Sequence, residues 1–165
     1  MRIYKSIIRV LETLLLLAAP GLPLLSNSTN GPADNMRGME QLIHQYVNQE
    51  RKSLGVPVLV WSEQVAAEAR RHAKNIAEGR TFTHEDPLRG NIDLRLEKSG
   101  IDWRRCAENL YEANFGDPAR DAVQAWLKSP GHRTNLMDSM FSEAGVGVAQ
   151  RSDGWIIVVQ EYIQK

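Results

Sequence analysis

Three ionisable side chains lie in sequence contexts from which they could do chemistry together: His84 in "TFTHEDP", Glu108 in "CAENLY" and His132 in "SPGHRTNL". Both histidines sit in turns beside proline and charged residues, the rigidly supported loop positions where functional side chains concentrate. A glutamate within a strand must face solvent or be buried with a cation or a hydrogen-bond donor. Two imidazoles and a carboxylate form a ligand set that zinc accepts, with one position left open for water.

The spacing of these residues does not by itself specify a metal. Each is separated from the next by 24 residues, whereas specific metal motifs place their ligands a few residues apart. Residue type and spacing alone therefore leave open that these are three unrelated polar residues. The other two histidines are weaker candidates, because His44 lies on a helix among polar neighbours and His72 lies on an apolar helix face, where a core role is more common.

Hydrophobic periodicity predicts the elements that must position the three side chains. His84 falls in a loop, Glu108 in an extended segment and His132 in the first turn of a helix, where Ser129 serves as N-cap and Pro130 as the first helical residue. The predicted helices run from 36 to near 55, from 62 through 76, over 91–98, from 117 to just before 129, and onward from 129; the predicted strands cover 103–113, 144–150 and 155–163.

The order of these elements predicts the fold class. Helices come first, mixed elements follow, and a turn at 152–154 joins two final strands into a hairpin. This order favours an α+β domain with helices packed on a small sheet. Gly145 and Gly147 do not complete the nucleotide-binding pattern G-x-G-x-x-G, because the third glycine and the following helix are missing. They are interpreted as strand positions to which a neighbouring element comes close.

Composition limits the classes of partner. A chain of 165 residues with 42% hydrophobic residues can bury one substantial core, so one domain is expected. Twenty basic and twenty acidic residues cancel, and no basic patch indicates a nucleic-acid partner. The single cysteine, Cys106, cannot form an intrachain disulfide.

The N-terminal residues differ from the rest of the chain. Arg2, Lys5 and Arg9 precede an apolar run at 14–25, which a polar, turn-rich stretch follows. This layout is typical of a secretory signal; a buried N-terminal helix is the alternative. We expect a signal peptide or N-terminal anchor at 1–25, a linker at 26–35 and the domain at 36–165. The protein is then secreted or extracytoplasmic, with membrane contact only through an uncleaved N-terminal segment.

Several linked motifs resemble those of the CAP superfamily, which contains cysteine-rich secretory proteins, insect venom allergens and plant pathogenesis-related proteins, and whose domain is also called SCP. They are the stretch at 42–77, then "FTHEDP", "AENLY", "AVQAWLKSPGHRTNLM" and "EAGVGVA", followed by a closing strand, in the family's order over roughly residues 38 to 163. The resemblance is nearest to the bacterial branch. It implies a three-layer α-β-α sandwich in which helices flank a small, largely antiparallel sheet.

The resemblance also implies a site. His84, Glu108 and His132 match residues that line the family's cavity, and His84 and His132 match the histidines through which members bind a divalent cation, often zinc. Ser129 stands where many eukaryotic members carry a second cavity glutamate. The missing negative charge weakens the expected hold on a metal.

Two functions follow as hypotheses. The first is an exported binding or interaction module whose cavity takes a divalent metal, a small molecule, a lipid or a protein ligand. The alternative is a zinc-assisted hydrolase in which the two histidines hold the metal and Glu108 accepts a proton from bound water. A thiol nucleophile at Cys106 is less favoured than a small core residue, since nothing indicates a base aimed at it.

Overall fold

The computed structural model describes residues 31–79 and 81–165. The predicted signal or anchor at 1–25 and the first half of the predicted linker, 26–30, lie outside these residues. Within them, the helices are α1 (Pro32–Ser53), α2 (Glu63–Gly79), α3 (Ile92–Lys98), α4 (Pro118–Lys128) and α5 (Pro130–Met137), and the strands are β1 (Val60–Trp61), β2 (Arg105–Ala113), β3 (Glu143–Gln150) and β4 (Ile156–Gln164). No helix in this described part is long and apolar enough to span a bilayer.

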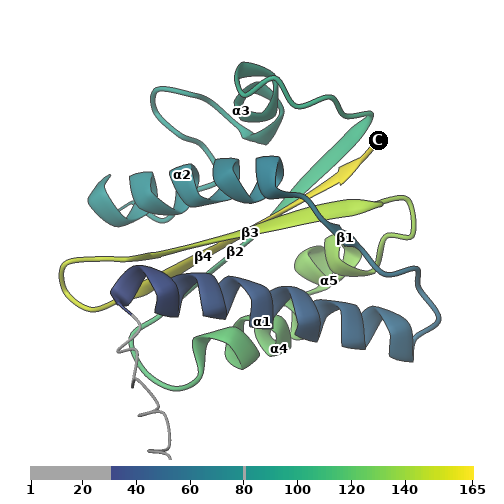
Figure 1. The fold of residues 1–165 in the computed structure, drawn as a ribbon, viewed down its shortest axis with the longest axis horizontal. Coiled ribbons are helices and arrows are strands. Elements are labelled where there is room, and N and C mark those ends of the chain that lie inside the picture. The colour runs from purple at the N-terminus through teal and green to yellow at the C-terminus, as the bar shows by residue number, and fades with distance from the viewer. Residues whose placement is uncertain (1–30, 80) are drawn as a thin grey trace, which may run out of the picture.

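The four strands form one sheet in the order β1-β3-β4-β2. The pairs β3–β4 and β4–β2 are antiparallel, and only β1 runs parallel to its neighbour β3. Helices α2 and α3 cover one face of the sheet, whereas α1, α4 and α5 cover the other (Figure 1). The predicted α+β sandwich with a largely antiparallel sheet is confirmed. Strand β1 escaped prediction because its two residues are too short for a period-2 pattern.

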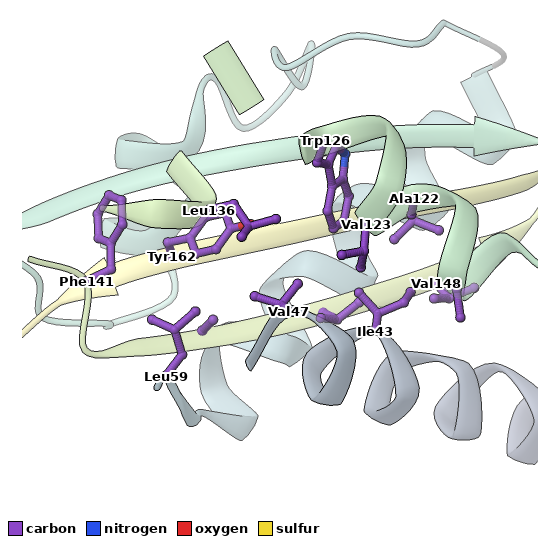
Figure 2. Close-up of a cluster of buried hydrophobic side chains, with 14 residues drawn as sticks. Ile43, Val47, Leu59, Ala122, Val123, Trp126, Leu136, Phe141, Val148 and Tyr162 are labelled. Carbon is purple, nitrogen blue, oxygen red and sulfur yellow. The ribbon is translucent and has the colours of Figure 1, made fainter. Parts of the chain in front are cut away.

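Large apolar side chains fill the space between the sheet and helices α1, α4 and α5 (Figure 2). Trp126 of α4 is fully buried there, and its indole Nε1 donates to the carbonyl of Leu110 on β2 at 2.9 Å. Because β2 is an edge strand, this bond satisfies an outward-facing carbonyl and fixes α4 against the sheet.

Helix α2 packs on the opposite face at backbone distance. A β-carbon on Gly145 would lie 2.1 Å from the amide nitrogen of Ala66, and one on Gly147 would lie 2.1 Å from that of Arg70. The interpretation of these glycines as positions of close approach is confirmed. This contact places the buried face of α2 directly over the middle of the sheet.

One predicted helix start and one predicted helix cap need correction. Helix α1 begins at Pro32, four residues earlier than predicted, because proline at the first helical position fixes a helical φ; residues 32–35 therefore belong to the helix rather than to the linker. Helix α5 begins at Pro130 as predicted, but the side chain of Ser129 makes no capping bond, and only its carbonyl accepts, from the amide of Arg133 at 2.8 Å.

His44 is buried rather than set among polar groups. It packs edge-on against Trp61 with ring centroids 5.3 Å apart, and Asn48 lies 3.1 Å from its Nε2. It is part of the packing between α1 and the β1 segment, which leaves it outside the site.

Candidate functional site

The centre of the candidate site is a hydrogen bond between His84 and Glu108. The Nδ1 of His84 lies 2.8 Å from Oε1 of Glu108, with the histidine side chain 59% exposed and the glutamate 3% exposed. A carboxylate can only accept, so Nδ1 is the donor, and in the neutral ring the lone pair is on Nε2. This arrangement orients an exposed imidazole through a buried carboxylate.

Strand β2 and helix α3 together position Glu108. In the β2–β4 ladder Glu108 lies opposite Glu161, so both carboxylates project from the same face of the sheet, toward α3. Arg95 of α3 is fully buried and its Nη2 contacts Oε2 of Glu108 and, at 3.1 Å, Oε1 of Glu161. One guanidinium therefore serves two buried carboxylates.

The same guanidinium reaches the loop that carries His84. Its Nη1 donates to the carbonyl of His84 at 2.8 Å and to that of Gly90 at 3.3 Å. From α2, Nε2 of His72 donates to the carbonyl of Thr83 at 3.1 Å. The loop is thus fixed on both sides of His84 by side chains that sequence reasoning had not placed in the site.

His72 is buried as predicted, but it belongs to the site rather than to an apolar core alone. Its Nε2 lies 3.8 Å from Oε2 of Glu108, and burial lowers the pKa of its imidazole. It also lines a pocket of about 150 Å³ between the end of α2 and the loop at 81–87. That pocket includes Thr83 and Glu85, on either side of His84.

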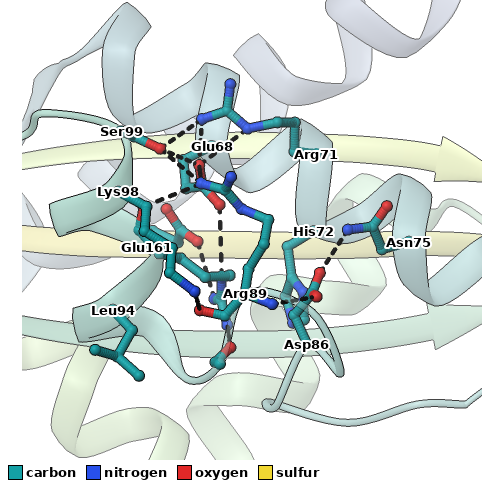
Figure 3. Close-up of polar contacts among 12 residues, drawn as sticks. Glu68, Arg71, His72, Asn75, Asp86, Arg89, Leu94, Lys98, Ser99 and Glu161 are labelled. Atoms are coloured by element: carbon teal, nitrogen blue, oxygen red, sulfur yellow. Dashed lines mark hydrogen bonds and ion pairs between the residues drawn. The ribbon is translucent and has the colours of Figure 1, made fainter.

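A third buried carboxylate, Glu68 of α2, extends the network (Figure 3). Its Oε2 accepts from Nη2 of Arg89 at 3.0 Å and from the hydroxyl of Ser99 at 2.5 Å, and Arg71 also donates to it. These bonds tie α2 to the segment around α3. Oε1 of Glu68 also lies 3.7 Å from Nε of Arg95, but the hydrogen bonds of Arg95 to carboxylates go to Glu108 and Glu161.

Glu161 is a fully buried carboxylate of the network. Burial, followed by the negative charge of Glu108, raises its pKa to about 8. Its Oε2 has no hydrogen-bond partner among the residues that the structure describes. A protonated, neutral Glu161 at pH 7 explains how a single arginine can stand between two carboxyl groups.

His132 reaches the same region from the other layer. It lies in the first turn of α5 and is half-buried; burial and then the nearby His84 lower the pKa of its imidazole. Asn109 of β2 donates to its backbone carbonyl at 3.1 Å, while Asn135 of α5 bonds the carbonyl of Glu108 at 3.2 Å. These amides fasten α5 to the free edge of β2, where the two helical layers meet.

The predicted site residues are therefore brought together unequally. His84 and Glu108 are directly hydrogen-bonded, and His84 is near enough to His132 to help lower the pKa of the His132 imidazole, after burial. In the described ranges, 31–79 and 81–165, no three His, Cys, Asp or Glu side chains are arranged to hold one metal ion. Cys106 is half-buried on β2, and burial raises the pKa of its thiol to about 11, which leaves it protonated and poorly nucleophilic at neutral pH.

Sequence signals could have found some of the missed residues. Glu161 stands in "VVQEYI", a largely apolar strand, where a buried carboxylate requires a partner just as at Glu108. Arg95 in "IDLRLEK" carried no such signal, because a cation on a short polar helix is normally solvated. Its burial arises from the long-range packing of α3 on β2 and β4.

Helices on both faces of a mixed four-stranded sheet, with a histidine–carboxylate pair beside the edge strand, define an α-β-α sandwich of the SCP-domain class. The chain belongs to the cysteine-rich secretory protein (CAP) family, whose family model matches residues 44–162. The resemblance seen in the motifs is thereby confirmed.

Relatives and solved structures agree with this assignment. YkwD of Bacillus subtilis is 25% identical over 147 residues, which cover 89% of this chain and 55% of that protein. The B. subtilis membrane protein YlbC is 32% identical over 112 residues, 68% of this chain and 32% of that protein. A Bacillus anthracis extracellular protein containing an SCP domain is 29% identical, with a TM-score of 0.71 over 90% of this chain and 45% of that one. The chain thus spans about half of these relatives or less.

Proposed function

We propose that this protein is an extracytoplasmic binding module in which His84 and His132 offer imidazole nitrogens to a ligand. The first ligand proposed is a divalent transition cation such as zinc. The observation that carries the proposal is the 2.8 Å bond from Nδ1 of His84 to buried Glu108, which makes Nε2 the ligating nitrogen of the neutral, exposed ring. An imidazole held in one tautomer by a carboxylate is a common arrangement for metal ligation.

The protonation of His132 supports the same proposal. Its lowered pKa keeps the ring neutral at physiological pH, and only a neutral imidazole has a lone pair to give. Two such rings without a third protein ligand make an open site. Water or a donor group of a small molecule, lipid or protein would complete the coordination of a bound cation.

The residues present do not fit the zinc centre of a hydrolase. A catalytic zinc takes three protein ligands and one water, whereas the described residues supply no such trio. Glu108, the base in the hydrolase hypothesis, has Oε1 engaged by His84 and Oε2 by Arg95. Glu108 is also only 3% exposed, so water has little access to it as a base, and binding is favoured over hydrolysis.

Extracytoplasmic placement rests on two supports. The charged start and apolar run at 1–25 have the layout of an export signal. The B. anthracis relative, 29% identical, is an extracellular protein. The N-terminal segment acts either as a cleaved signal or as an anchor, and fractionation of the host cells followed by N-terminal sequencing distinguishes the two.

Calorimetric titration of the full chain with zinc near neutral pH tests the binding site. The wild type should release heat with one cation per chain, and the double variant His84→Ala/His132→Ala should lose that heat. Either single variant should weaken binding about tenfold or more, since each removes one of two protein ligands.

Glu85→Gln is the matched control for this titration. Glu85 is exposed and adjacent to His84 in the same loop, so its replacement removes a nearby charge without removing a proposed ligand. The control should bind zinc with nearly wild-type affinity. Equal heats from the wild type and the double histidine variant would refute the proposed site.

A further inference from the structure

We infer that Arg95 is a positioning residue of this site, one that sets the tautomer of His84 by holding both the main chain of His84 and the carboxylate bonded to its ring. The inference rests on the proposed binding role of His84. Its test, described below, needs no metal and can therefore succeed or fail independently of that role.

Arg95 holds two parts of the site at once, the main chain of His84 and the carboxylate of Glu108. Nη1 donates to the carbonyl of His84 at 2.8 Å, which fixes the position of this loop relative to α3. Nη2 contacts Oε2 of Glu108, which turns the other oxygen, Oε1, toward Nδ1 of His84. The planar fork of guanidinium suits this task, because its donors are fixed relative to one another.

The contacts divide the two oxygens of Glu108 between two partners. Glu108 and Glu161 lie opposite each other in the ladder and share Nη2 of Arg95, with Glu161 the more deeply buried. Because Oε2 of Glu108 is held by Arg95, Oε1 is the oxygen that accepts from Nδ1 of His84.

Arg51 provides a matched arginine elsewhere in the fold. It is equally buried, yet all its hydrogen bonds go to main-chain carbonyls: Pro57 at 2.7 Å, Leu136 at 2.7 Å, Asp138 at 3.1 Å and Phe141 at 3.3 Å. Loss of Arg51 should damage packing between α1 and α5 without reaching His84. It therefore separates a general loss of stability from a specific effect on the site.

The experiment measures the ring ¹⁵N shifts of the histidines in the full, metal-free chain at about pH 7.5, above the usual histidine pKa. The wild type should show His84 with its proton on Nδ1. Arg95→Met should lower the ratio of the Nδ1–H to the Nε2–H form about threefold or more, because the carboxylate and the loop are both released.

Three further variants complete the design. Arg95→Lys keeps the charge but cannot reach the carbonyl of His84 and the carboxylate together, so it should give an intermediate ratio. Glu161→Gln keeps a neutral group of the same shape and should retain the wild-type ratio. Arg51→Met should lower thermal stability and leave the His84 signals unchanged.

An unchanged His84 ratio in folded Arg95→Met would overturn the inference, as would an equal shift in Arg51→Met. If Arg95→Met does not fold, Arg95→Lys decides alone, and a wild-type ratio in that variant overturns it. A clear shift together with no zinc heat would leave the positioning role standing and reject the metal. Zinc binding together with no shift would do the reverse.

Discussion

One face of the sheet is covered by α1, α4 and α5 through large apolar side chains, with Trp126 and Tyr162 at the centre. The other face, under α2 and α3, has smaller apolar clusters on either side of the buried carboxylates Glu68, Glu108 and Glu161. Neighbours on one strand divide between the two: Tyr162 of β4 enters the first layer, and Glu161 enters the second. The polar face is the one that carries His84.

The difference shows that the face carrying the site contributes less to the stability of the fold than the apolar face. Burying ions costs several kcal/mol each, and an ion pair recovers that cost only with good geometry, so a network of this kind is weak evidence for stability. It does, however, fix orientations. The apolar face holds the layers together, and the polar face orients a ring on the surface.

The largest effect on the free energy of unfolding is expected where α2 packs against the backbone of β3. The apolar face has no contact of this kind among the glycines of the described residues. Gly147→Ala would place a β-carbon 2.1 Å from the amide nitrogen of Arg70, where only main chain could yield. We expect destabilisation of about 3 kcal/mol or more, or failure to fold, measured by urea denaturation followed by circular dichroism.

Gly131→Ala is the matched control on the other layer. Gly131 lies in α5, and a β-carbon there would meet nothing within 4 Å. Its stability should stay within about 0.5 kcal/mol of the wild type. A Gly147→Ala protein as stable as this control would show that α2 does not depend on close approach.

The apolar face could be predicted from the sequence, because its helices show regular 3.6-residue stripes and its hairpin a clear turn. On the polar face the sequence indicated Glu108 and His84, each with an unusual local context. It did not indicate Arg95, since nothing in seven residues of helix specifies which distant strands will bury that side chain. It indicated that His72 is buried, but not that His72 lies beside Glu108, because an apolar stripe reports burial and not the partner. Charges that pair across long stretches of the chain leave no periodic pattern in the sequence.

A smaller effect concerns the pH dependence of the polar face. The pKa of Glu161 is about 8 in the folded chain against an ordinary value of 4.5, so between these pH values the folded chain holds a proton that the unfolded chain has released. Stability should therefore fall as pH rises through this window, by at most about 1.4 kcal/mol per pH unit from this group.

Glu161→Gln removes this titration, because glutamine stays neutral throughout. Urea denaturation of both proteins in the same buffers at several pH values measures the difference. The free energy of unfolding of the variant should rise relative to that of the wild type as pH rises from about 4.5 to 8. Parallel curves would mean that Glu161 is ionised in the folded protein, and that Arg95 carries two anions.

The smallest effect is expected from an ion pair at the surface of the apolar layer. Nη1 of Arg105 lies 2.7 Å from Oδ2 of Asp138, but the arginine side chain is 52% exposed. Water and salt screen such a pair, and holding two side chains in place costs entropy, so Arg105→Ala should cost below about 1 kcal/mol. Added salt should reduce even that difference, because exposed charges are screened within about 3 Å at 1 M. A larger, salt-insensitive loss would mean that α5 depends on this contact for its docking, and that the apolar layer also depends on a fixed charge.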